Sequence, residues 1–111
     1  MRVVRTTFDR RDMRRERRYL VPTFEVTVGD RQFHTVNWSM SGLLLDRPYR
    51  GLALGSRVDC SLTVLGSAEV LYLTAEVVRI DPDTGASALR FEEIGSEEVD
   101  FLDRAVAHRL H

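Results

Sequence analysis

The chain has 111 residues, 43% hydrophobic and 30% charged, which is the composition of one ordinary globular domain. No apolar run approaches the ~20 residues that a membrane-spanning helix needs, and polar sequence after the basic N-terminus argues against a signal peptide. Cys60 is the single cysteine, which excludes an intrachain disulfide and a cysteine-based zinc cluster. We therefore expect a cytoplasmic setting, with Cys60 as a small core residue and not a nucleophile.

The net charge of −1 hides an uneven distribution. Residues 1–18 hold eight arginines and three acids, whereas the other 93 residues hold eight arginines and fourteen acids. Residues 1–13 also lack a periodic apolar pattern, so we expect a flexible basic N-terminal arm there and a folded domain over residues 14–111. Such an arm could also be no more than a solvated tail or a generic contact for polyanions.

Six stretches alternate apolar with polar residues or are rich in β-branched residues, and each predicts a strand. They are residues 20–28, 31–37, 43–46, 57–65, 70–80 and 86–91. In the first stretch, Leu20 and Phe24 fall on the apolar face. Gly29-Asp30 predicts a two-residue hairpin turn of the primed type.

The period then changes from 2 to 3.6, which predicts a C-terminal helix over residues 96–110 with Ser96 as its N-cap. Its apolar stripe consists of Val99, Leu102, Val106 and Leu110. We expect this stripe to pack on the sheet or cap an open end of it, with a dimer seam as the alternative. An all-β fold with one terminal helix, a barrel or a sandwich, follows from these elements.

The stretch from Asn37 to Gly42 lies where the second strand ends. If the strand pleat continues to Ser39, Asn37 and Ser39 face one way and Trp38 the other, and we expect the two polar side chains outside the core and the Trp38 ring inside it. We favour core packing for Trp38 over stacking on a base. Gly42 is expected at a turn that needs a positive φ, and on its own the stretch could simply be a strand end capped by Asn and Ser.

Enzyme chemistry is not predicted. The sequence shows no paired nucleophile and base, no paired catalytic carboxylates and no glycine-rich phosphate loop. The histidines lack metal-ligand spacing, since His108 and His111 are only three residues apart on a helix end with no third ligand. We expect no metal and no cofactor.

Two motifs together resemble the PilZ domain, a bacterial receptor module for cyclic di-GMP. Arg14-Arg15-Glu16-Arg17-Arg18 supplies Arg-x-x-x-Arg before the first strand, and Asn37-Trp38-Ser39-Met40-Ser41-Gly42 supplies Asp/Asn-x-Ser-x-x-Gly after the second. The later stretch 74–79, with Gly85 and Arg90-Phe91, is similar to the closing strands of that family. The resemblance covers roughly residues 10 to 95.

The resemblance implies a six-stranded antiparallel Greek-key-type β-barrel that binds cyclic di-GMP on its outer face. Arg14 and Arg18 would contact guanines and phosphates, and Asn37, Ser39 and Gly42 would hold the other side. Because the family often binds an intercalated pair of ligand molecules, neighbouring arginines could contribute: Arg10, Arg11, Arg15 and Arg17. The pairs Arg10/Arg14 and Arg11/Arg15 also fit the motif, but Arg14/Arg18 lies nearest the strand.

The function expected from this resemblance is a signalling module whose arginine arm closes over the nucleotide and signals to an unidentified downstream protein. The alternative is a protein-interaction module on the same fold that does not bind the nucleotide. A nucleic-acid binder is disfavoured, because the body beyond the arm is acidic and its polar faces carry no aromatic platform.

Overall fold

The computed structural model describes residues 17–108. Their elements are six strands and one helix: β1 (Phe24–Val28), β2 (Arg31–Trp38), β3 (Gly42–Pro48), β4 (Arg57–Val64), β5 (Leu71–Ile80), β6 (Ala86–Glu92) and α2 (Ser96–His108). No helix in this part of the chain is long and apolar enough to cross a membrane.

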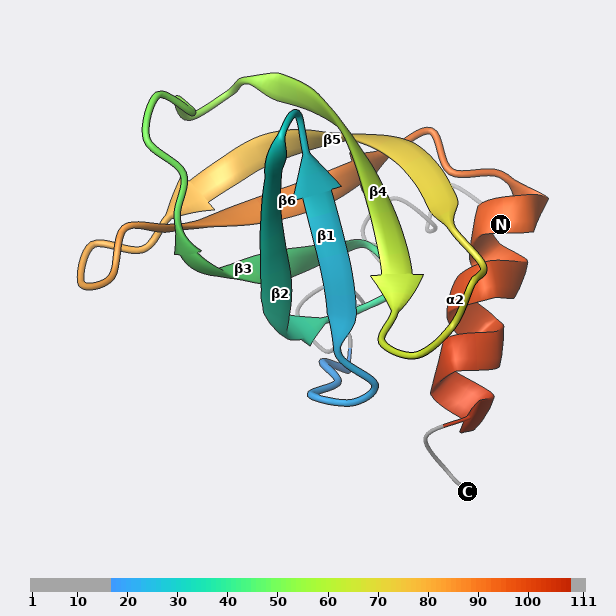
Figure 1. The fold of residues 1–111 in the computed structure, drawn as a ribbon. Coiled ribbons are helices and arrows are strands. Elements are labelled where there is room, and N and C mark those ends of the chain that lie inside the picture. The colour runs from blue at the N-terminus through green and yellow to red at the C-terminus, as the bar shows by residue number, and fades with distance from the viewer. Residues whose placement is uncertain (1–16, 109–111) are drawn as a thin grey trace, which may run out of the picture.

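The strands form one closed antiparallel barrel in the order β1-β2-β3-β6-β5-β4 (Figure 1). The chain runs up and down through β1, β2 and β3, then returns by a long connection so that β4 lies beside β1. This is the Greek-key arrangement, and β6 closes the barrel on β3. The predicted six-stranded antiparallel Greek-key barrel with a terminal helix is therefore confirmed.

The barrel begins later than the alternation predicts. β1 starts at Phe24, whereas Leu20 and Val21 are 68% and 54% exposed. The expectation that Leu20 faces the core is therefore wrong. Instead Tyr19 forms an isolated bridge with Trp38, and the indole nitrogen of Trp38 donates to the carbonyl of Pro22 at 2.8 Å.

The barrel interior is filled by aromatic and aliphatic side chains that are almost fully buried, the largest being Trp38, Phe24, Phe33, Leu43, Leu45, Leu62 and Leu89. Core packing of Trp38 is thereby confirmed. Cys60 is also confirmed as a core residue, with 5% exposure. Burial raises the pKa of its thiol to about 12, with a smaller contribution from Asp59, so the reactive thiolate is disfavoured at neutral pH.

Helix α2 lies along the outside of the barrel, next to the connection between β4 and β5 (Figure 1). It buries Phe101, Leu102 and Ala105, and the ring of Phe101 lies 5.9 Å from that of Phe24. The predicted packing of the helix against the barrel is confirmed for its described part. Of the predicted stripe, Leu102 is fully buried, Val99 and Val106 are half-buried, and Leu110 lies outside the described residues.

The helix is capped one residue earlier than expected. The amide of Val99 donates to the carbonyl of Gly95, which is the first intrahelical bond, and this makes Gly95 the N-cap in place of Ser96. The Glu98 carboxylate accepts a hydrogen bond from the Gly95 amide at 2.7 Å. This contact is the acidic half of a capping box.

Candidate functional site

The segment that leads into the barrel is fixed by Tyr19. Its amide donates to the Trp38 carbonyl at 2.7 Å, and its carbonyl accepts from the Trp38 amide at 2.9 Å. The two rings lie 4.9 Å apart. Because Arg18 directly precedes Tyr19, this pairing holds Arg18 beside the end of β2.

The side chain of Arg18 joins two of the predicted site residues. Its Nε and Nη2 atoms donate to Asn37 Oδ1 at 3.0 and 2.7 Å, and Nη1 donates to Ser39 Oγ at 3.1 Å. Arg18, Asn37 and Ser39 are therefore brought together as one cluster. Asn37 acts as the acceptor in this cluster.

The position of Asn37 depends on a bulge in β2. Thr35 pairs with Leu45 and Asn37 pairs with the next residue of β3, Leu44, so Val36 is an extra residue. Thr35 is buried, and strict alternation would have turned Asn37 inward as well. The bulge instead puts Asn37 on the outer face and Trp38 in the core, because bulges re-aim the side chains that follow them.

Ser39 departs from its predicted position. It was expected outside the core, yet it is fully buried. Its hydroxyl accepts from the Ser41 amide at 3.2 Å and lies 3.3 Å from the Ser41 hydroxyl, besides accepting from Arg18. The buried Ser39 hydroxyl thus holds the guanidinium of Arg18, and Ser39 itself is not exposed at the surface.

Gly42 has a different role from the one predicted. Its φ is not in the left-handed region, so the expected positive-φ turn is wrong. A methyl group at this position would overlap the carbonyl oxygen of Leu89 on β6. Gly42 is needed because β3 and β6 approach closely where it pairs with Arg90.

An open pocket of about 300 Å³, which we call the arginine pocket, adjoins this cluster on the outer face of the barrel. Its apolar floor comes from β3, β5 and β6, and three arginines surround it. The lining residues are Arg18, Asn37, Ser41, Gly42, Leu43, Leu44, Val78, Arg79, Ala88, Leu89 and Arg90. Three guanidinium groups around an apolar floor suit a ligand that combines anionic groups with a flat aromatic base.

Arg79 and Arg90 were not predicted as site residues. Arg90 donates to the Glu76 carboxylate at 2.8 Å. The alternation of the last strand does place Arg90 on the polar face. Arg79 could not have been found in this way, since its orientation also depends on a bulge.

The remaining predicted arginines are placed only in part. Arg17 is exposed at the start of the described region. Arg10, Arg11, Arg14 and Arg15 lie outside the described residues, so the choice of Arg14 as the partner of Arg18 stays a prediction. His111 also lies outside, and residues 17–108 contain no cluster of three potential metal ligands.

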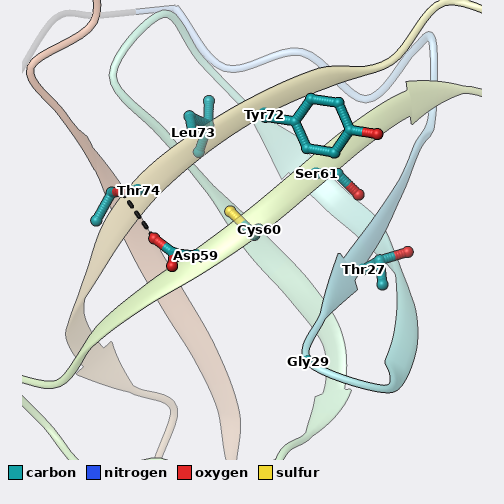
Figure 2. Close-up of a pocket in the computed structure, with 8 residues that line it drawn as sticks. All are labelled: Thr27, Gly29, Asp59, Cys60, Ser61, Tyr72, Leu73 and Thr74. Carbon is teal, nitrogen blue, oxygen red and sulfur yellow. Dashed lines mark hydrogen bonds between the residues drawn. The ribbon is translucent and has the colours of Figure 1, made fainter.

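A larger hollow of about 550 Å³ lies on another face of the barrel, over β1, β4 and β5 (Figure 2). Its walls carry hydroxyl groups and one acid, Asp59, whose carboxylate accepts from Thr74 at 3.0 Å. Tyr72 stands at its rim with 75% exposure. None of the arginines among residues 17–108 lines this hollow, so this part of the chain supplies no positive charge there to balance an anionic ligand.

Comparisons with known proteins agree with the fold. A family model described as "PilZ domain" matches residues 9–108. Among solved structures, the chain is similar to the Bacillus subtilis inhibitor of motility, MotI/DgrA, with a TM-score of 0.64 and 19% identity over 84% of this chain. The chain spans about half, 49%, of that protein.

A second solved structure is the PilZ domain of CeSA from a cellulose-synthesizing bacterium, with a TM-score of 0.60 and 19% identity. The match covers 86% of this chain and 99% of that domain. A search of curated proteins found no match.

Proposed function

Because the chain belongs to the PilZ domain family, we propose that it is a receptor for cyclic di-GMP and not an enzyme. The nucleotide lies in the arginine pocket, beside Arg18 and Asn37, and Ser39 contributes by holding Arg18. The observation that carries this proposal is the Arg18 side chain, which is hydrogen bonded to both Asn37 and Ser39 at the edge of that pocket.

The chemistry of the ligand matches these groups. Cyclic di-GMP carries two phosphates and two guanines, and a guanidinium group can pair with phosphate or donate two parallel hydrogen bonds to the O6/N7 edge of guanine. Asn37 and Ser39 hold Arg18 in place before the ligand arrives, which lowers the entropy cost of binding. Gly42 keeps β3 and β6 close enough to form a continuous floor.

The N-terminal arm completes the site in this proposal. Arg14 contacts the guanines and phosphates together with Arg18, and the other arm arginines contribute if an intercalated pair of ligand molecules binds: Arg10, Arg11, Arg15 and Arg17. Closure of the arm over the nucleotide is the signal passed to a downstream protein. Since Tyr19 is bonded to Trp38, the movement pivots on the N-terminal side of Tyr19.

The test is calorimetric titration of cyclic di-GMP into the chain, with GTP and single-stranded DNA as controls. We expect binding that is selective for cyclic di-GMP, and a stoichiometry near two for an intercalated pair. Binding of all three ligands with a steep loss at high salt would instead indicate a generic basic arm. No heat from folded protein would favour the alternative, an interaction module that does not bind the nucleotide.

The matched variants are Arg18→Ala and Arg50→Ala. Arg18→Ala should abolish cyclic di-GMP binding and leave the melting temperature nearly unchanged, because the Ser39 hydroxyl keeps its bond to Ser41. Arg50 is exposed in the loop between β3 and β4 and does not line the arginine pocket. Arg50→Ala should bind like the wild type, which separates a local contact from the loss of one positive charge.

A further inference from the structure

A second bulge, in β5, turns Arg79 toward the arginine pocket. Val77 pairs with Leu89 and Arg79 pairs with the preceding residue of β6, Ala88, so Val78 is an extra residue. Without it, Arg79 would be opposite Ser87, which is buried. The bulge therefore moves Arg79 from the interior to the outer face, where it lines the pocket.

Arg79 and Asn37 lie at the two ends of one row across the barrel. Asn37 pairs with Leu44, Leu44 with Ala88, and Ala88 with Arg79. Three strand spacings separate the backbones at the two ends by about 14 Å. Leu44 and Ala88 form an apolar surface between them, on which a purine ring can lie flat.

Arg79 is also the pocket arginine whose donors are least engaged by other described side chains. Arg18 donates to Asn37 and Ser39, and Arg90 donates to Glu76. Within residues 17–108, the Arg79 guanidinium makes no hydrogen bond or ion pair. The backbone amides of Asp83 and Thr84 lower the pKa of Asp81, and the charge of Arg79 adds to this effect. The N–H donors of Arg79 nevertheless remain available to a ligand on the side of the pocket opposite Arg18.

We propose that Arg79 is a specificity-determining residue, which donates two parallel hydrogen bonds to the O6/N7 edge of a guanine lying on Leu44 and Ala88. This inference rests on the proposed function. Guanine presents two acceptors along that edge, whereas adenine presents one acceptor and an amino donor. The two parallel donors of the Arg79 guanidinium thus favour binding of cyclic di-GMP over cyclic di-AMP.

The experiment measures the affinity of the chain for cyclic di-GMP and cyclic di-AMP in the wild type and in three variants: Arg79→Ala, Arg79→Lys and Arg50→Ala. Arg79 is exposed, so its substitution should leave the melting temperature unchanged. We expect Arg79→Ala to weaken cyclic di-GMP binding about tenfold or more, the range for losing one bidentate guanine contact. Binding of cyclic di-AMP should change less, so the selectivity ratio should fall.

Arg79→Lys distinguishes hydrogen bonding to the guanine edge from simple attraction by a positive charge. Lysine keeps the positive charge but lacks the planar guanidinium with its two parallel donors. Arg79→Lys should therefore lose nearly as much selectivity for cyclic di-GMP over cyclic di-AMP as Arg79→Ala. Arg50→Ala should keep the selectivity of the wild type. Wild-type affinity in Arg79→Ala, full selectivity in Arg79→Lys, or an equal loss in Arg50→Ala would each overturn the inference and leave the receptor function standing. If the wild type itself does not bind cyclic di-GMP, both proposals fall.

Discussion

At Gly42 the backbones of β3 and β6 lie so close that a side chain has no space. We expect Gly42→Ala to lower the free energy of unfolding by about 1–3 kcal/mol, the usual cost of overpacking. The overlap would be with the Leu89 carbonyl, a backbone atom that cannot rotate away. Chemical denaturation of the two proteins measures the difference.

Gly51→Ala is a contrasting substitution, in which the backbone conformation and not a lack of space opposes the added methyl group. An added methyl group at Gly51 meets no atom within 4 Å, and only its φ of 89° opposes the substitution. Gly51→Ala therefore measures only the free energy lost when alanine is held in the left-handed backbone conformation. A change within about 0.5 kcal/mol in Gly42→Ala, as at an ordinary surface site, would show that the strands can separate without loss.

At the scale of elements, the start of α2 depends on one side chain. Glu98 accepts the Gly95 amide, which would otherwise be left without a helical partner. Glu98→Ala should lower the free energy of unfolding by about 0.3–1.5 kcal/mol. Glu98→Gln should retain most of the wild-type free energy of unfolding, because glutamine can make the same capping contact.

Glu97→Ala provides the control for the helix start. Glu97 lies in the same first turn and interacts with the same helix dipole, but the bond to Gly95 comes from Glu98. The measurement is urea denaturation of the three variants beside the wild type. An equal loss in Glu97→Ala and Glu98→Ala would mean that charge near the helix N-terminus, and not the capping bond, sets the stability.

The bulges explain why the sequence predicts the strands better than the site. Alternation identifies six strands and a helix because burial on one face imposes a period of 2 or 3.6. It does not reveal where an extra residue is inserted, and the insertions at Val36 and Val78 decide the orientation of Asn37 and Arg79. The motif located Asn37 through family resemblance, whereas the resemblance of stretch 74–79 to the closing strands gave Arg79 no role.

Across the whole molecule, a line of aromatic rings runs from the entry of the chain to the C-terminal helix. Tyr19 contacts Trp38 at 4.9 Å, Trp38 contacts Phe24 at 4.8 Å, and Phe24 contacts Phe101 on α2 at 5.9 Å between ring centroids. These contacts join residues whose proximity cannot be predicted from the alternation of apolar and polar residues in the sequence. The β1–β2 hairpin places Phe24 and Trp38 at the same end of the barrel, and the C-terminal helix brings Phe101 to that end.

Trp38 is the only tryptophan of the chain, so its fluorescence reports on this line of rings without interference. Its ring is fully buried against Tyr19, which follows Arg18 directly. In the proposed function the arm closes over the nucleotide next to Arg18, so ligand binding changes the surroundings of the neighbouring Tyr19–Trp38 ring pair. We therefore expect cyclic di-GMP to shift or quench the emission, with a midpoint that matches calorimetry and no change in Arg18→Ala. Saturated binding with an unchanged spectrum would mean that the movement of the arm does not extend as far as Arg18 and leaves the Tyr19–Trp38 ring pair undisturbed.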